Sequence, residues 1–233
     1  MIISGLTPVS LIDWDGHPCS VVFTSGCNFR CPWCHNAELV LRDYKHKDSI
    51  TKLDFSKKFI DHVCITGGEP TMYGDLSQLC LLLKNAGMKV KLDTNGSRPF
   101  RIFPLINFNL IDYIAMDIKA PFTKEKYSKA SGVNFTEDYL LWPLESIDMI
   151  MKSSIDYEFR TTVVPGFHTP KDIEQIAKYA IKGAKRYVIQ NFHPCETLID
   201  PHLESIKPFS SAELEAFADA ARPYVNEVRC RNV

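Results

Sequence analysis

Three cysteines lie close together near the start of the chain, at Cys27, Cys31 and Cys34. Thiolates at this spacing can bind three corners of an iron–sulfur cluster from one short loop. Because no fourth cysteine follows on that loop, one metal position would stay open to an outside ligand, as it does at catalytic zinc sites. The spacing therefore predicts a reactive metal site. A structural zinc ion, with His35 or a distant cysteine as fourth ligand, is the alternative.

Polar residues follow six short runs that are rich in β-branched and aromatic side chains. We expect these runs to be strands, at residues 20–24, 62–66, 88–93, 113–118, 157–164 and 186–192. Ligands of parallel α/β folds bind at the carboxyl ends of the strands. We therefore expect one composite site that joins the cysteine loop to Gly67, Gly68, Glu69, Pro70, Asp93, Thr94, Asn95, Asp117, Lys119, Arg160, Asn191 and His193.

Helical patterns alternate with these strands. Three stand out: residues 76–83 before Gly87, residues 170–180 after the N-cap Thr169, and residues 211–221, where Ser210 and Glu213 form a capping box. Such alternation predicts a parallel sheet, either doubly wound or curled into a barrel. We expect one domain over residues 1–233, with a core of about 16–200 and a helical C-terminal segment of about 201–233.

The composition is that of a folded globular protein. The chain has 233 residues, of which 45% are hydrophobic and 24% are charged, and these values exclude a disordered chain. A net charge of −1 gives no general attraction to nucleic acid or to an anionic membrane. Because Asp13, Asp15 and His17 interrupt any signal-peptide core and no apolar run reaches membrane-spanning length, we expect a cytoplasmic protein.

The segment from Gly26 to Asn36 resembles the cluster loop of radical S-adenosylmethionine (SAM) enzymes. Within that superfamily, the ending Cys34-His35-Asn36 and the segments at residues 93–96, 117–119 and 163–166 are similar to the activating enzymes of glycyl radical enzymes. The resemblance implies a partial (β/α)6 barrel of the TIM type. It also implies a [4Fe-4S] cluster on the three cysteines, with SAM on the open iron.

The resemblance assigns further residues to the bound SAM. Trp33 would lie near the adenine, and residues 67–70 would hold the amino group of the methionine moiety. Asp93 and Asp117 would hold a monovalent cation, and Lys119 and Arg160 would face the carboxylate. The other positions that the resemblance places at the cofactor are Asn36, Thr94, Asn95 and His193. Without the resemblance, the same residues have purely structural interpretations. Trp33 would be a core aromatic, and the others would form strand-ending turns, caps and ion pairs.

Two outer segments resemble one group of activating enzymes more than the others. Residues 5–16 and the segment 195–198 are similar to the activating proteins of anaerobic ribonucleoside-triphosphate reductase. That resemblance implies the reductase as partner and, since no second cysteine cluster is present, a flavodoxin or ferredoxin as electron donor. The alternatives are an activating enzyme of another glycyl radical enzyme, such as a formate-lyase type, and a radical SAM enzyme that acts on a small molecule.

Overall fold

The fold is a curved sheet with helices on its outer side. The computed structural model describes residues 1, 3–41 and 60–231. Its strands are β1 (Ile3–Ser10), β2 (Cys19–Thr24), β3 (His62–Gly67), β4 (Lys89–Thr94), β5 (Tyr113–Asp117), β6 (Asp156–Val163), β7 (Tyr187–Asn191) and β8 (Val228–Arg231). Its α-helices are α1 (Ala37–Leu41), α2 (Leu76–Asn85), α3 (Pro99–Asn107), α4 (Lys124–Ser131), α5 (Glu137–Lys152), α6 (Pro170–Tyr179) and α7 (Ser211–Ala221).

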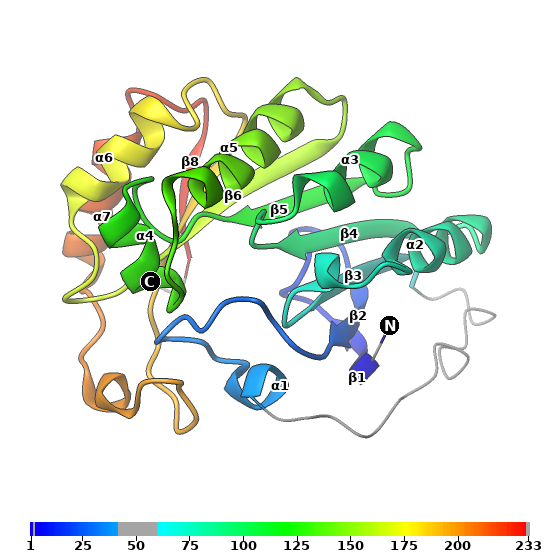
Figure 1. The fold of residues 1–233 in the computed structure, drawn as a ribbon, viewed down its shortest axis with the longest axis horizontal. Helices are drawn as coiled ribbons and strands as arrows, with labels where there is room; N and C mark the ends of the chain where they lie inside the picture. Colours follow the sequence, from blue (N-terminus) through cyan, green and yellow to red (C-terminus); the bar gives the residue numbers. More distant parts are fainter. Residues whose placement is uncertain (2, 42–59, 232–233) are drawn as a thin grey trace.

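The eight strands form one sheet in the order of the sequence. Strand β1 pairs antiparallel with β2, and every pair from β2 to β8 is parallel. Figure 1 shows α2, α3, α5 and α6 along one side of the sheet, whereas α1 and the loop before it lie across the other side. Consecutive parallel strands with outer helices make an open barrel of the TIM type, so the predicted fold class is confirmed.

All six predicted strands are present, as β2 to β7. The two edge strands β1 and β8 were not predicted. Strand β8 also corrects the expectation of a helical C-terminal segment, because residues 228–231 extend the parallel sheet beside β7. None of the helices in the described ranges combines the length and the apolar character that crossing a lipid bilayer requires.

The predicted helix starts are confirmed by their caps. At α7 the Ser210 hydroxyl and the Glu213 carboxylate form the capping box, and at α6 Thr169 and Asp172 do the same. Both helices then bury apolar faces that pack against one another. Such caps satisfy the free N–H groups of the first turn and stabilise a helix by about 1 kcal/mol each.

The interior contains three apolar clusters, and the two larger ones position the site. The first lies between the outer face of the sheet and the helices, and contains Leu92, Ile114 and Phe159 from three adjacent strands. The second lies above the carboxyl ends of the strands, where Phe29 and Trp33 of the cysteine loop pack with Tyr127 of α4 and with Leu203. The cysteine loop is therefore held by its own apolar cluster, separate from that of the sheet.

Candidate active site

A cavity of about 190 Å³ opens at the carboxyl ends of β2 to β6. The three cysteines line it together with sixteen other residues. The lining residues predicted from the sequence are Cys27, Cys31, Cys34, Trp33, Asn36, Gly67, Gly68, Glu69, Asp93, Thr94, Asn95, Asp117, Lys119 and Arg160. The structure therefore brings fourteen of the seventeen predicted site residues to one cavity.

The remaining three predicted site residues do not line the cavity. Asn191 is buried at the end of β7, where its side-chain amide donates to the Phe209 carbonyl at 2.7 Å. Pro70 begins the short 3₁₀ helix η2 (Pro70–Met72) and is buried beneath the site. The His193 side chain is exposed, and its backbone carbonyl lies 2.7 Å from Nε2 of His35. The end of β7 does not reach the cavity because the following chain folds over the cysteine loop, where the Asp200 N–H donates to the Pro32 carbonyl at 2.9 Å.

The cysteine loop is fixed by hydrogen bonds from the chain around it. The N–H of Phe29 donates to the Cys27 sulfur at 3.3 Å, and the Asn95 side-chain amide lies 3.9 Å from the same sulfur. The Arg30 N–H donates to Ser131 at the end of α4. Burial raises the pKa of Cys27 to about 12 and that of Cys31 to about 11, so both carry a proton at neutral pH until a metal displaces it.

The two glycines after β3 are required by the chain itself. A Cβ on Gly68 would lie 1.8 Å from the Gly26 carbonyl oxygen, and one on Gly67 would lie 2.4 Å from the Thr24 backbone. Gly67 also has φ +116°, which L side chains rarely adopt. The resemblance assigns the pair to the amino group of SAM, and that role stays a prediction. The structure shows that the pair lets the strand end pass directly against the start of the cysteine loop.

Glu69 is buried and accepts four hydrogen bonds. Its Oε1 accepts from the Thr71 N–H, the Thr71 hydroxyl and the Thr94 hydroxyl, and its Oε2 accepts from the Asn95 N–H at 2.7 Å. Burial raises the pKa of this carboxyl, although all four donors favour the ionised form. Glu69 thereby ties the end of β3 to the end of β4.

Arg160 lies between the two predicted aspartates. Its Nε donates to Asp117 at 2.8 Å and its Nη1 donates to Asp93 at 3.2 Å. Lys119 adds a contact to Asp117 at 3.0 Å, and Lys91 lies 3.2 Å from Asp93. Burial alone would raise the pKa of Asp117, but the two cations outweigh it and lower that pKa to about 2. A cation held by both carboxylates stays a prediction, and it would have to share them with Arg160.

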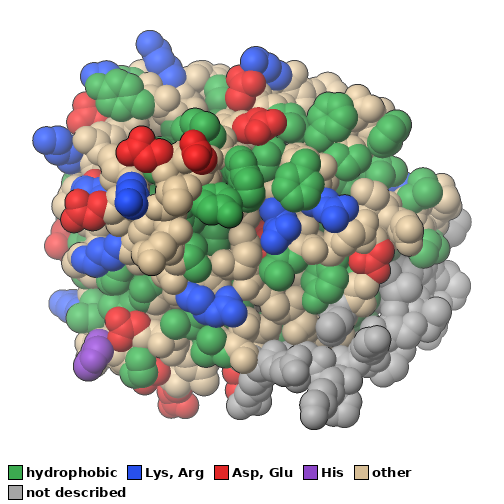
Figure 2. Space-filling model, in the orientation of Figure 1, with side chains coloured by type: hydrophobic (Ala, Val, Ile, Leu, Met, Phe, Trp, Pro, Cys, Tyr) green, Lys and Arg blue, Asp and Glu red, His purple; other side chains and the backbone are tan. Residues whose placement is uncertain are grey.

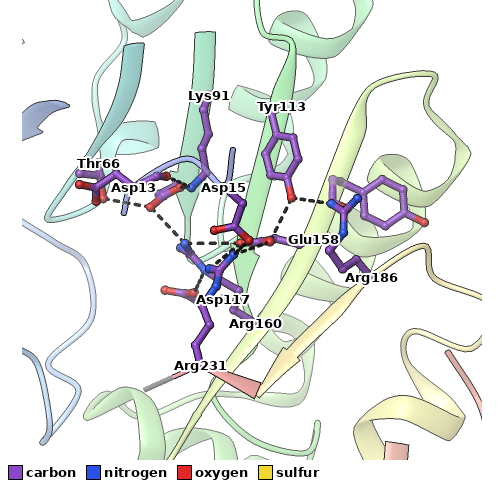
Figure 3. A network of polar contacts seen from close by, with 12 residues as sticks. Asp13, Asp15, Thr66, Lys91, Tyr113, Asp117, Glu158, Arg160, Arg186 and Arg231 are labelled. Carbon is purple, nitrogen blue, oxygen red and sulfur yellow. Dashed lines mark hydrogen bonds and ion pairs between the residues drawn. The ribbon is translucent and has the colours of Figure 1, made fainter. Parts of the chain in front are cut away.

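A polar network continues from Arg160 toward the amino ends of the strands (Figure 3). The buried Glu158 lies two residues before Arg160 on β6, with a carboxylate oxygen 3.9 Å from its Nη1. Arg231 of β8 donates to both oxygens of Glu158 at 3.1 Å and to Asp15 at 2.6 Å. Tyr113 donates to Glu158 at 3.0 Å. The site is thus connected to the last strand of the sheet.

Several residues of the site were missed from the sequence. Thr66 and Thr162 line the cavity. They lie on β3 and β6 close to predicted site residues, so the alternation of side chains along a strand could have identified them. Phe29 and Val40 also line it. His168 lies behind the wall, where its ring meets Trp33 edge-on at 5.3 Å. No local pattern marks His168, since only the folded chain brings it to Trp33.

Comparisons with known proteins agree with this geometry. The family model of the radical SAM superfamily matches residues 21–180. The chain belongs to the radical SAM superfamily. A protein of Methanocaldococcus jannaschii whose name places it among glycyl-radical enzyme activating enzymes is 33% identical over 238 residues, with 100% of this chain and 96% of that protein covered. A second protein of that organism with the same kind of name is 28% identical, with 90% and 79% covered.

The radical SAM fold is also shared with a solved structure. The crystal structure of Streptococcus suis SuiB bound to S-adenosylmethionine matches with a TM-score of 0.66 at 14% identity. The match covers 90% of this chain and 49% of SuiB, so the chain spans about half of that protein. At this identity the likeness concerns the fold alone.

The cavity has the chemical groups that a radical SAM enzyme needs. Enzymes of this superfamily use a [4Fe-4S] cluster and SAM, and three thiols of one loop face the same space as the carboxylate, amide and cationic groups of four strand ends. Three cysteines would leave one iron free for the amino and carboxylate groups of SAM. The donor set therefore fits both cofactors, and it replaces the structural zinc alternative.

Proposed function

We propose that this radical SAM enzyme activates a glycyl radical enzyme by placing a radical on one glycine of that partner. The observation that carries the proposal is the cavity in which Cys27, Cys31 and Cys34 face Glu69, Asp117 and Arg160. Two relatives that match most of the chain bear names of glycyl-radical enzyme activating enzymes. The partner we propose is anaerobic ribonucleoside-triphosphate reductase, since residues 5–16 and 195–198 resemble its activating proteins.

The residues of the chain have distinct parts in this function. The three cysteines would bind the cluster, which, when reduced, supplies the electron that cleaves SAM into methionine and a 5′-deoxyadenosyl radical. Lys119 and Arg160 would face the SAM carboxylate, and Glu69 with the Gly67 backbone would face its amino group. Trp33, Asn36, Thr94 and Asn95 would complete the SAM site. One hydrogen atom would then pass from the glycine Cα to the 5′-carbon, giving 5′-deoxyadenosine and a glycyl radical.

The reaction needs an electron that the chain does not store. We propose that a flavodoxin or ferredoxin supplies it, and that both proteins meet this enzyme in the cytoplasm. Proton transfer is not required for hydrogen-atom abstraction, so the site needs binding and positioning groups rather than a general base. The cavity wall supplies such groups, because Glu69 and Arg160 are both held by several partners.

The test is anaerobic reconstitution with iron and sulfide, followed by reduction and addition of SAM and the reductase. We expect release of 5′-deoxyadenosine together with a glycyl radical signal on the reductase in electron paramagnetic resonance. Cys31→Ala should lose both. Cleavage of SAM with no glycyl radical on the reductase or on a formate-lyase type enzyme would refute the activating function and favour a small-molecule substrate.

A further inference from the structure

A second cavity of about 420 Å³ lies beside the cysteine loop, outside the barrel. Its walls come from the cysteine loop, the start of α3, and the segment that leads into α5. We call it the aromatic groove, and define it by Phe29, Arg98, Phe100, Phe135, Tyr139 and Trp142. None of these residues was predicted as part of the site.

The aromatic groove shares a wall with the central cavity. Phe29 lines both. Asn28, also in the groove, accepts a hydrogen bond at 3.0 Å from the Asn95 side chain, whose amide lies 3.9 Å from the Cys27 sulfur. Phe29 is 3% exposed and therefore forms part of the wall between the central cavity and the groove.

The groove exposes aromatic area that a protein would normally bury. Phe100, Tyr139 and Trp142 are 54%, 47% and 40% exposed. Figure 2 shows hydrophobic side chains gathered over the part of the molecule where α3 and α5 lie, with basic side chains beside them. The Tyr139 and Trp142 rings already meet edge-on at 4.7 Å, so little side-chain freedom would be lost on binding. Grouped exposed aromatics of this kind mark protein interaction sites.

The charge of the groove points to an acidic or carbonyl-rich ligand. Arg98 is the charged side chain of its wall, and its buried Nε has no hydrogen-bond partner. Among the residues that the structure describes, no carboxylate pairs with Arg98. A guanidinium placed beside apolar rings can form a bidentate pair with a carboxylate from a partner.

We propose that the aromatic groove binds the partner segment next to the reactive glycine. This inference rests on the proposed function. If the glycine reaches the central cavity, the residues beside it in that segment must leave the cavity, and the groove is the aromatic surface next to it across Phe29. The segment would place an apolar or aromatic side chain between Phe100 and Trp142, and a carboxylate at Arg98.

The test compares two activities of one enzyme. Trp142→Ala, Tyr139→Ala and Arg98→Glu change the groove but no lining residue of the central cavity. We expect each to raise KM for the purified reductase at least about tenfold in glycyl radical formation. Cleavage of SAM without reductase, with a chemical reductant, should stay within about twofold of wild type. Tyr179→Ala, an exposed tyrosine on α6, is the matched control and should change neither activity.

The possible failures are distinguishable. If wild type forms the glycyl radical and the three variants keep its KM, the groove is not the docking site and the proposed function stands. If wild type cleaves SAM but forms no radical on the reductase or on a formate-lyase type enzyme, both proposals fail. A change in self-association by light scattering, without a change in KM, would assign the groove to a second copy of this chain. If the aromatic variants do not fold, KM of the Arg98→Glu variant still tests the proposal.

Discussion

Glu69 is the acceptor that joins two strand ends at the site. Both of its oxygens are occupied by donors of η2 and of the loop after β4. In Glu69→Gln the side-chain oxygen can still accept, but the new NH₂ group would face the Asn95 N–H. A buried donor without an acceptor costs about 1–3 kcal/mol. The adjacent Asn95 side chain, which contacts Cys27 and Asn28, should then shift.

We therefore expect Glu69→Gln to lower the free energy of unfolding by about 1–3 kcal/mol and to weaken SAM binding to the reconstituted enzyme. Urea unfolding and equilibrium dialysis with labelled SAM measure the two effects. Glu204→Gln, at an exposed position, is the control and should change neither. Unchanged stability and SAM affinity in Glu69→Gln would mean that the four hydrogen bonds do not position the site.

His168 is held as a neutral ring. The Val164 N–H donates to its Nδ1 at 3.1 Å, so Nδ1 must carry a lone pair and Nε2 must carry the proton that is donated to the Lys119 carbonyl at 2.8 Å. Burial lowers the pKa of this histidine below its usual value near 6.5. His168 thus links the ends of β5 and β6 and supports Trp33 from behind.

This histidine predicts a dependence of stability on pH. As the pH falls below about 6.5, the unfolded chain takes up a proton on His168 before the folded chain does, so stability is lost. The loss between pH 7.5 and 5.5 should be about 1 kcal/mol. His168→Gln, measured by urea unfolding at both pH values, should remove that part, and His202→Gln at an exposed position should not. An equal slope in wild type and His168→Gln would contradict the neutral ring.

At the level of elements, the helices and strands that could be predicted are those marked by local sequence patterns. The capping residues of α6 and α7 and the apolar runs of β2 to β7 are local, and all were predicted. Helices α3 and α5 contain Pro104 and Pro143, which remove a backbone donor and hide a helical pattern. Strands β1 and β8 are sheet edges. Each has one neighbouring strand, and most of its residues are only partly buried, so the sequence carries a weaker burial signal there.

Strand β8 contributes to the site through Arg231, although none of its residues lines the central cavity. Arg231 binds both oxygens of Glu158, whose carboxylate lies 3.9 Å from the Arg160 Nη1 atom that donates to Asp93. Without Arg231, Glu158 would keep Tyr113 and should draw the Arg160 guanidinium toward itself. Arg231 is therefore a positioning residue in this account, because its effect reaches the site only through Arg160.

We expect Arg231→Ala to raise KM for SAM several-fold while kcat for SAM cleavage changes less, and to lower stability by about 2 kcal/mol. Steady-state release of 5′-deoxyadenosine separates KM from kcat. Arg231→Lys should restore part of the affinity. Arg229→Ala is the matched control, since Arg229 lies on the same strand and contacts Asp15 and Glu227. Equal kinetics in Arg231→Ala and wild type would show that Arg160 does not need the last strand.

At the scale of the whole molecule, the site was predictable where one segment carries it. The cysteine loop and the glycine pair are short motifs, and the three cysteines and both glycines line the cavity. The partners that hold them are distant in the sequence: Arg160 meets Asp93 across 67 residues, and Arg231 meets Glu158 across 73. Such pairs depend on how distant strands are placed in the sheet, which no local pattern contains. His193 was predicted from its position after a strand, yet it does not line the cavity. A strand-end position does not place a residue in the site when the next segment of chain covers that end.

The sheet cluster is separate from the cluster around Phe29 and Trp33. This separation predicts that the barrel can fold without the metal site. The sheet cluster contains none of the three loop cysteines, whereas Cys31 belongs to the smaller cluster around Phe29 and Trp33. The triple variant Cys27→Ala, Cys31→Ala and Cys34→Ala should therefore keep its far-UV circular dichroism and cooperative unfolding, with a loss of no more than about 3 kcal/mol. It should hold no iron after reconstitution and release no 5′-deoxyadenosine.

Cys80→Ala tests the same separation from the other side. Cys80 is fully buried on α2 within the sheet cluster, so its removal should leave a cavity and lower stability by about 1 kcal/mol. Its iron content and SAM cleavage should equal those of wild type. Iron analysis, unfolding and product release are measured on both variants. If the clusters are independent, the triple variant loses iron and product release but still unfolds cooperatively, whereas Cys80→Ala loses stability but keeps both iron and product release. If the triple variant instead unfolds, the cysteine loop is part of the folding core, and removal of the metal should destabilise the barrel as a whole.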